Sequence, residues 1–366
     1  MTVRVPLREH REAAYDIVIG RGALAELPRL VRDACPAARY AVISDSQVAR
    51  LWGAEVVARL EQGGAATQLV TFPAGERHKS RETWATLSDA LLAARYGRDG
   101  AIIALGGGVV GDVAGFVAAT YLRGIPYVQV PTTLLAMIDS SIGGKTGVDA
   151  PSGKNLLGAF YRPRLVVADL ALLDSLPDPQ LVAGLAEAVK HGVVADAAYF
   201  AFLEAAHGAV LGRDPDVLEQ VVARSVAIKA EVVTADEREA GRRAILNFGH
   251  TIGHAIEAAT QFAVLHGEAV AIGMACEARL AEAFAVAAPG TARRLGALLR
   301  QFGLPLERPA GVGVDAILGA MELDKKARGG AVRFALPRAI GTMQGDASGW
   351  TVAVPEPLVR QTLAAD

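Results

Sequence analysis

Cysteine and aromatic residues are scarce in this chain. Only Cys35 and Cys276 occur among its 366 residues, and Phe, Trp and Tyr together make up 5%. Two cysteines this far apart exclude a fold built on disulfides, so we expect both to be reduced and packed in cores. The chain also lacks an apolar run long enough to span a membrane, and residues 1–12 lack the apolar centre of a secretion signal. These absences predict a cytoplasmic protein without a membrane partner.

Neither sign of charge is in excess. The 37 Lys and Arg residues against 39 Asp and Glu residues give a net charge of −2, so no long-range field favours a nucleic acid or an anionic membrane. Lysine is rare: only seven of the 37 basic residues are Lys, and the others are Arg. A compact ammonium in a tight site cannot be replaced by a guanidinium. We therefore expect most of the lysines to lie at functional positions, rather than by chance on the surface: Lys79, Lys145, Lys154, Lys190, Lys229, Lys325 and Lys326.

The order of apolar patterns predicts two domains, at residues 1–176 and 177–366. In the first, short β-branched runs alternate with Ala-, Leu- and Arg-rich helical segments, which predicts a mainly parallel sheet covered on both faces. The predicted strands are residues 15–19, 40–44, 68–72, 101–105, 127–130 and 165–168, and examples of the helices are 47–62 and 82–94. The second domain is mainly α-helical, with helices at 179–194, 197–211, 217–235, 250–260, 268–284 and 291–302 and a short β pair at 332–337 and 350–354.

Two glycine-rich segments suit anion binding. Residues 101–112 read as a strand, a Gly106-Gly107-Gly108 turn and the start of a helix, where free backbone N–H groups could hold a phosphate. Because this pattern alone is weak, it leaves open either nucleotide binding or a tight structural turn. Residues 139–147, with 153–155 after them, form a second loop rich in Gly and Lys. It predicts contacts to phosphate or hydroxyl groups, with a surface turn as the alternative.

Three of the seven histidines lie within residues 250–266. His250 and His254 are four residues apart, so they share a helix face, and His266 follows at the start of another element. Glu187 can add an oxygen ligand, which gives three protein ligands and an open position, as in catalytic zinc sites. The spacing does not decide which of His250 and His254 binds the metal and which is an acid or base. His191, beside Lys190, is either a further ligand or a packed side chain.

Taken together, these motifs resemble the 3-dehydroquinate synthase family, within the sugar phosphate cyclases. The resemblance covers nearly the whole chain and is densest at residues 106–175 and 184–268. The matching strings include G-G-G-V-V-G-D, D-S-S-I-G-G-K-T-G-V, G-K-N-L-L-G-A-F, G-L-A-E-A-V-K, N-F-G-H-T-I-G-H-A-I-E, L-H-G-E-A-V and L-D-K-K. Their combination is far more specific than any one string.

The resemblance implies a Rossmann-like α/β N-terminal domain, a mainly helical C-terminal domain, a homodimer, bound NAD+ and one divalent metal, with Zn2+ preferred over Co2+. The implied reaction converts 3-deoxy-D-arabino-heptulosonate 7-phosphate to 3-dehydroquinate and phosphate in the shikimate pathway. It implies transient oxidation, β-elimination of phosphate, re-reduction, ring opening and an intramolecular aldol step.

The resemblance also implies residue roles. The metal ligands are expected to be Glu187, His250 and His266, which leaves His254 as a neighbouring acid or base. The expected substrate-binding and catalytic residues are Arg123, Asp139, Lys145, Asn155, Lys190, Lys229, Arg243, Asn247, His254 and Lys325, with Lys326 as the alternative to Lys325. The expected NAD+ contacts are Asp45, Glu76, Lys79, Gly107, Gly108, Val109, Val110, Gly111, Asp112, Thr132, Thr133, Lys145, Lys154, Asn155, Leu172 and Ser175.

Three other functions compete with this one. Another sugar phosphate cyclase would share the scaffold but make a different carbocycle. A metal-dependent polyol dehydrogenase of similar architecture would release NADH during turnover. A protein that holds the cofactor without catalysis is disfavoured, because every expected metal and phosphate position carries a competent residue.

Overall fold

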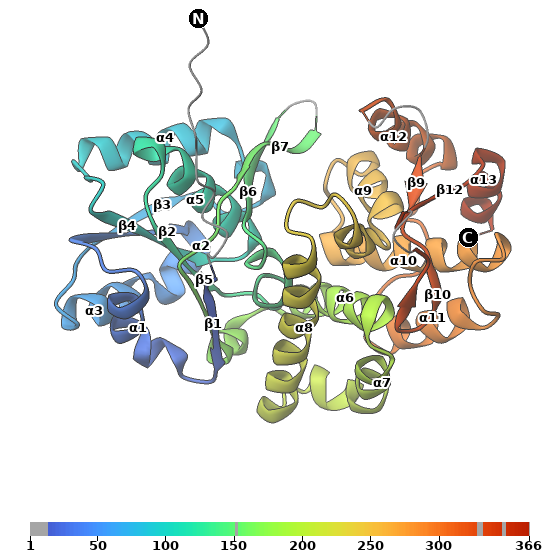
Figure 1. Ribbon diagram of the computed structural model, residues 1–366, viewed down its shortest axis with the longest axis horizontal. Helices are drawn as coiled ribbons and strands as arrows, with labels where there is room; N and C mark the ends of the chain where they lie inside the picture. Colours follow the sequence, from blue (N-terminus) through green and yellow to red (C-terminus); the bar gives the residue numbers. More distant parts are fainter. Residues whose placement is uncertain (1–13, 151–152, 328–331, 346–348, 366) are drawn as a thin grey trace, which may run out of the picture.

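A six-stranded sheet organises the first half of the molecule (Figure 1). The structure, a computed structural model, describes residues 14–150, 153–327, 332–345 and 349–365, without the side chains of residues 322–327. All neighbouring strands of this sheet are parallel, in the order β1-β8-β5-β4-β2-β3. Their bounds are Asp16–Gly20 (β1), Arg39–Asp45 (β2), Ala66–Phe72 (β3), Gly100–Gly106 (β4), Tyr127–Pro131 (β5) and Leu165–Asp169 (β8). The six predicted strands and the parallel sheet are therefore confirmed.

Helices cover both faces of the sheet. Consecutive residues of a strand point to opposite faces, and both Val42 and Ile43 of β2 are fully buried. Val42 packs in a cluster with α1 (Leu27–Ala34) and α3 (Ala54–Gln62), whereas Ile43 packs with α4 (Arg81–Ala93) and α5 (Gly108–Thr120). The short helix α2 (Ser46–Val48) and a π turn (Ala49–Gly53) lead into α3. The result is a doubly wound, Rossmann-like layer arrangement.

The strand order reverses beside β2. The chain passes from β2 outward to β3, then returns to β4 on the other side of β2 and continues to β5 and β8. In open parallel sheets, ligands bind outside the carboxyl ends of the strands at such a reversal. Asp45 ends β2 and Gly106 ends β4 at this place, which brings two distant predicted motifs to one edge.

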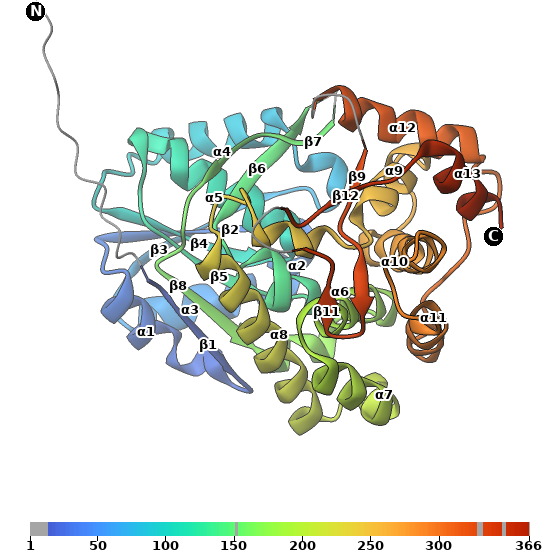
Figure 2. The ribbon, with the colours of Figure 1, turned by 45° about the vertical axis from the view of Figure 1, so that its right-hand side comes forward.

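The second glycine-rich segment was predicted as a loop, and that prediction is wrong in part. It forms an antiparallel hairpin of β6 (Lys145–Ala150) and β7 (Gly153–Phe160), which stands over α5 (Figure 2). Gly147 and Gly158 face each other across this pair, and a Cβ on Gly158 would lie 2.3 Å from the Thr146 carbonyl oxygen. The glycines that suggested a loop therefore allow two strands to approach closely.

Helices dominate after Leu176. They are α6 (Asp178–Ala195), α7 (Ala197–Leu211), α8 (Pro215–Ala235), α9 (His250–Ala259), α10 (His266–Ala283), α11 (Thr291–Gln301), α12 (Val314–Ala327) and α13 (Glu356–Ala364). The predicted β pair forms between β9 (Arg333–Phe334) and β12 (Val352–Ala353), and β10 (Pro337–Ala339) pairs with β11 (Thr342–Met343). Helices α12 and α13 were not predicted. Among the described residues, no helix is both long and apolar enough to cross a membrane.

The two halves share a core. One apolar cluster runs from Val42 and Ile103 in the sheet to Leu185 in α6 and Val222 in α8, which lie between the halves in Figure 1. The predicted boundary at residues 176 and 177 falls between a 3-10 turn (Leu170–Ser175) and α6. It remains a prediction, because this continuous packing gives no sharp division.

Candidate active site

Glu187, His250 and His266 meet at the junction of three helices. Glu187 lies in the middle of α6, and the two histidines are the first residues of α9 and α10. One ligand atom from each of the three residues lies within 4.8 Å of the others. The Nε2 atoms of His250 and His266 lie 3.5 and 3.6 Å from Glu187 Oε1, which is buried without a hydrogen-bond partner among the described residues. A buried, unsatisfied carboxylate oxygen facing two imidazole nitrogens fits a divalent cation.

Close packing of α9 against α10 fixes the two histidines. Gly249, the residue before α9, has a left-handed φ of 79°, and a Cβ there would lie 2.4 Å from Met274 Cγ. A Cβ on Gly273 of α10 would lie 1.9 Å from the Gly249 carbonyl oxygen. Glu277, also of α10, accepts hydrogen bonds from the backbone N–H groups of Gly249 (2.7 Å) and Ile252 (3.1 Å). The helix that begins with His250 is thus anchored on the helix that begins with His266.

The protonation of Glu187 and His250 favours metal binding, whereas that of His266 opposes it. Burial raises the pKa of Glu187, but the ammonium of Lys190 outweighs it and holds that pKa far below its usual range. Burial and the charge of Lys190 lower the pKa of His250 well below its usual range, so its ring is neutral and can ligate. Burial lowers the pKa of His266, but the nearby carboxylates of Glu187 and Glu257 outweigh burial and raise that pKa to about 9. A metal at its Nε2 would have to displace that proton.

Buried charges extend from the triad toward α8. Lys190 pairs with Glu187 and lies 3.9 Å from Asp139 Oδ1, whereas Lys229 Nζ lies 2.5 Å from the same oxygen. Lys190 and Lys229 are 1% and 6% exposed. Burial lowers the pKa of Lys229 to about 8, although Asp139 opposes this effect. Two lysines therefore offset two carboxylates, and a divalent cation would give the centre an excess of two positive charges.

Other predicted substrate residues surround this centre. Lys145 and Asn247 are linked by Glu239, which pairs with the Lys145 ammonium and accepts a hydrogen bond from Asn247 Nδ2 at 2.5 Å. Arg243 is 3% exposed and donates to the Glu237 carbonyl oxygen. Arg243 Nη2 also lies only 2.5 Å from the position that a Cβ on Gly143 would take. The Gly/Lys hairpin and residues 236–247 thus approach each other here.

The carboxyl edge of the sheet fits a dinucleotide. Gly107 is the N-cap of α5, so the first N–H groups of that helix have no partner within it. Thr132 follows β5, and its Oγ1 is buried without a hydrogen-bond partner among the described residues. Asp45 accepts from the backbone N–H groups of Gln47 and Val48 at the end of β2. Bare amides and a free hydroxyl suit a pyrophosphate at this edge.

Some predicted cofactor residues act differently in the fold. The Lys79 ammonium, 5% exposed, donates to Asp112 Oδ2 at 2.6 Å, so these two side chains satisfy each other. The side chains of Val110 and Leu172 are buried in apolar clusters, so these residues can contact a cofactor only through their backbone atoms. Ser175 Oγ accepts from Trp52 Nε1 at 3.2 Å. The remaining predicted positions at this edge are Glu76, Gly108, Val109, Gly111 and Thr133.

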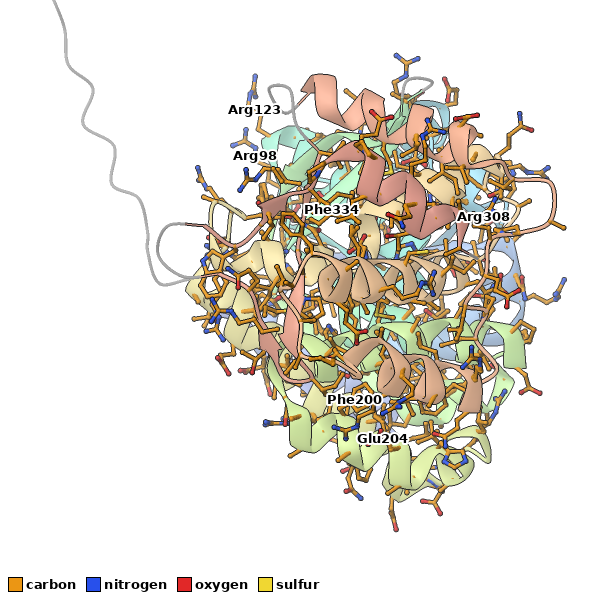
Figure 3. All side chains as sticks on the ribbon, turned by 90° about the vertical axis from the view of Figure 1, so that its right-hand side faces the viewer. Arg98, Arg123, Phe200, Glu204, Arg308 and Phe334 are labelled. Atoms are coloured by element: carbon orange, nitrogen blue, oxygen red, sulfur yellow. The ribbon has the colours of Figure 1, made fainter. Side chains whose placement is uncertain are left out.

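Four predicted catalytic residues are exposed or have side chains outside the described residues. Arg123 is exposed in the turn after α5, at the end opposite the glycine turn, and Figure 3 shows it at the edge of the molecule. The Asn155 side chain is exposed on β7. The His254 side chain is 58% exposed, against 13% for His250, although their ring centroids are 5.1 Å apart. The side chains of Lys325 and Lys326, in the last turns of α12, lie outside the described residues.

The sequence did not reveal two polar residues of this centre, Glu257 and Glu239, and it left the role of a third open. Glu257 is 2% exposed and accepts a hydrogen bond from Lys154 Nζ at 3.0 Å. Glu239 joins Lys145 to Asn247, as described above. The role of His191 was left open; its ring is fully buried, and its Nε2 lies 3.5 Å from Asp139 Oδ1. Glu257 is the last residue of the N-F-G-H-T-I-G-H-A-I-E string and shares a helix face with His250 and His254, which was the available signal.

Comparisons with known proteins give the family. Residues 69–183 match the model of the 3-dehydroquinate synthase N-terminal region, and residues 184–327 match that of the C-terminal region. A 3-dehydroquinate synthase from Symbiobacterium thermophilum is 52% identical over 328 residues, which are 89% of this chain and 92% of that protein.

Solved structures agree with these matches. A 2-epi-5-epi-valiolone synthase from Streptomyces hygroscopicus with NAD+ and Zn2+ bound has a TM-score of 0.89 and 32% identity, over 99% of each chain. A 2-deoxy-scyllo-inosose synthase complexed with carbaglucose-6-phosphate, NAD+ and Co2+ has a TM-score of 0.88 and 30% identity, over 95% of this chain and 96% of that one. Because both family models match and the Symbiobacterium relative is 52% identical over most of the chain, this chain belongs to the 3-dehydroquinate synthase family.

Proposed function

We propose that this protein is a 3-dehydroquinate synthase, a carbon–oxygen lyase acting on a phosphate. It converts 3-deoxy-D-arabino-heptulosonate 7-phosphate to 3-dehydroquinate and phosphate, with NAD+ and one divalent cation, Zn2+ or Co2+. The observation that carries the proposal is the Glu187, His250 and His266 triad beside two buried lysines that share Asp139. Family membership supports the choice of substrate.

The charge of the centre suits this substrate. With a divalent cation bound, Lys190 and Lys229 leave two positive charges in excess over Glu187 and Asp139. The heptulosonate phosphate carries a carboxylate and a phosphate, whose anionic oxygens gain from fixed cations in a site closed to water. A neutral polyol would gain less, which favours a cyclase over a polyol dehydrogenase.

The cation and NAD+ would each supply one kind of chemistry. The cation would lower the pKa of the substrate hydroxyl to be oxidised, and NAD+ would accept a hydride and later return it. Glu187, His250 and His266 would hold the cation.

The side chains of this chain do the remaining work. Lys190 and Lys229 hold substrate oxygens and stabilise the negative charge that develops when phosphate leaves. Lys145 and Arg243 neutralise the phosphate from the hairpin side. His254, largely exposed next to His250, is free to exchange a proton with the substrate. Asp139 keeps the two lysines in place.

The backbone contributes at the sheet edge. The amides of Gly107 and Gly108 would hold the pyrophosphate of NAD+ at the start of α5. Lys154, whose ammonium lies 3.2 Å from Glu76 and 3.0 Å from Glu257, lies between this edge and the triad.

We also propose that the protein works as a homodimer in the cytoplasm. Leu156, Leu157 and Phe160 of β7 are 59%, 40% and 49% exposed, which supports association through this hairpin. Sedimentation equilibrium of the purified protein would test the dimer.

Product analysis tests the proposed reaction. Purified protein is incubated with the heptulosonate phosphate, NAD+ and Zn2+, while phosphate, 3-dehydroquinate and absorbance of NADH are followed. We expect equal amounts of phosphate and 3-dehydroquinate without accumulation of NADH, loss of turnover with a chelator, and recovery with added metal. Accumulating NADH would instead identify a dehydrogenase, and a different carbocycle would identify another cyclase.

A further inference from the structure

The two histidines of the triad present the same ring nitrogen to Glu187. Their Nε2 atoms lie 3.5 and 3.6 Å from Glu187 Oε1. On the opposite side of each ring, His250 Nδ1 lies 3.1 Å from the Phe248 carbonyl oxygen, and His266 Nδ1 lies 3.2 Å from Glu257 Oε1. Since both partners are acceptors, each Nδ1 carries the proton in the neutral ring. The lone pair of each Nε2 is then directed at the metal position.

The partner of His266 differs from that of His250. The Phe248 carbonyl is part of the main chain just before α9, whereas Glu257 is a charged side chain of α9 that is 2% exposed. The oxygen that faces His266 also accepts a hydrogen bond from Lys154 Nζ at 3.0 Å. Lys154 belongs to β7 in the other half of the molecule, where its ammonium lies 3.2 Å from Glu76. It also lies 4.5 Å from the ring centre of Phe262, which follows α9.

We propose that Glu257 is a positioning residue that sets the tautomer and ring orientation of His266, and that Lys154 holds Glu257 in place. The inference rests on the proposed function, in which Glu187, His250 and His266 hold the cation. A contiguous chain of contacts, Glu76 to Lys154 to Glu257 to His266, thereby joins the cofactor edge of the sheet to a metal ligand. Metal affinity then depends on a lysine contributed by the other half of the molecule.

Glu257 could alternatively be a ligand itself. His254, Glu257 and His266 form a second group with ligand atoms within 4.8 Å of one another. Each carboxylate has one oxygen beside an ammonium, Lys154 at Glu257 and Lys190 at Glu187, and one buried oxygen without a hydrogen-bond partner among the described residues. The second group, however, needs His254, whose side chain is 58% exposed and whose Nε2 lies 4.0 Å from Glu257 Oε2. Both imidazoles of the triad lie closer to Glu187 Oε1, at 3.5 and 3.6 Å, which favours the triad as the metal position and Glu257 as its support.

Metal affinity without turnover tests the proposal. Metal-free wild-type protein and the E257Q variant are titrated with Co2+ against a chromophoric chelator, and the visible spectrum of bound Co2+ is recorded. We expect E257Q to bind Co2+ about 10 to 100-fold more weakly, with a changed spectrum, because outer carboxylate partners of ligating histidines contribute this much. K154M should weaken Co2+ binding less than E257Q does. Its effect should be smaller when E257Q is already present, because Lys154 acts on His266 through Glu257 Oε1.

E277Q is the matched control. Glu277 is also a fully buried acidic side chain between α9 and α10, but its hydrogen bonds go to backbone N–H groups and not to a ligand ring. Because the amide oxygen of Gln still accepts those bonds and α9 stays anchored, we expect wild-type Co2+ affinity and spectrum in E277Q. An equal loss in E257Q and E277Q would mean that helix packing, not the His266 ring, is what Glu257 supports, and would overturn the proposal.

A measurement on the wild-type protein covers the case in which E257Q does not fold. Two-dimensional NMR of protein with 15N-labelled histidine rings assigns the tautomer of His266 in the zinc form. We expect a proton on Nδ1 and metal at Nε2; a proton on Nε2 would overturn the proposal. The proposed function fails separately, if wild-type protein binds no stoichiometric cation or if E187Q binds it as tightly.

Discussion

Main-chain groups dominate the carboxyl edge of the sheet, whereas ionised side chains dominate the junction of α6, α8, α9 and α10. At the edge, Gly107 and Gly108 present helix N–H groups, and Lys79 and Asp112 are occupied with each other. At the junction, Glu187, Lys190, Asp139 and Lys229 are ionised in contact with one another. The edge can therefore bind a cofactor through its shape and its backbone dipoles. The junction holds fixed charges, which are suited to stabilising the charge that develops on a substrate during reaction.

Removing a ligand at the junction should have the largest effect. E187Q leaves two imidazoles and a neutral amide, and we expect turnover to fall about 10³-fold or more, since a metal Lewis acid contributes several kcal/mol. Steady-state phosphate release and bound zinc are measured together, with E219Q on the exposed face of α8 as the control. Wild-type turnover in E187Q would remove the triad from the reaction.

Replacing the buried Lys190 by arginine should have the second-largest effect on turnover. Lys190 is 1% exposed between Glu187 and Asp139, so the larger, planar guanidinium of K190R cannot reproduce both contacts. We expect kcat to fall about 10² to 10³-fold, as on loss of one preorganised electrostatic group, with zinc still bound. Thermal unfolding of the variant separates this loss from misfolding, and an unchanged kcat would contradict the role of the compact ammonium.

At the sheet edge, G107A should weaken NAD+ binding without affecting metal binding at the junction. A Cβ on Gly107 would lie 3.1 Å from Thr133 Cγ2, next to the free amides of the turn. We expect NAD+ to bind about tenfold more weakly, a difference of about 1.4 kcal/mol, while Co2+ affinity stays at the wild-type value. Calorimetric titration with NAD+ measures the first quantity; an equal loss of Co2+ affinity would show that the two regions are not built separately.

The smallest effect concerns Glu277, a neutral counterpart to the ionised junction. Burial raises its pKa to about 8, although backbone N–H groups of α9 oppose this effect. Because the native state keeps a proton that the unfolded chain releases above its ordinary pKa, this residue's contribution to stability is lost as pH rises toward 8. The melting temperature of wild type minus that of E277Q should therefore decrease between pH 5 and pH 8. A constant difference would mean that Glu277 is ionised throughout.

Local patterns predicted the sheet well and the junction poorly. The strands ending at Asp45 and Gly106 are short apolar runs bounded by turn residues, so their pairing followed from the alternation of strands and helices. The hairpin was missed because Gly147 and Gly158 are typical of loops, and only the facing strand shows that they permit close approach. Helix α13 was missed because its apolar positions are few and are interrupted by charges.

The junction combines residues that no local spacing connects. Lys229 of α8 and Asp139 of a π turn (Ala136–Ser140) meet only through tertiary packing. Spacing also could not separate His250 from His254, since both lie on one helix face; their different exposures depend on how α9 crosses α10. The family resemblance supplied these assignments, and their roles stay predictions.

The position of the bound cation is the most direct test of the proposed metal site. Anomalous diffraction at the zinc edge, from crystals of the zinc-loaded protein, locates the ion among the three candidate groups of ligands that the described residues contain. We expect one peak about 2.0 to 2.2 Å from Glu187 Oε1 and from the Nε2 atoms of His250 and His266. A peak between His254, Glu257 and His266, or between Asp139, Glu187 and His191, would contradict the proposed metal site.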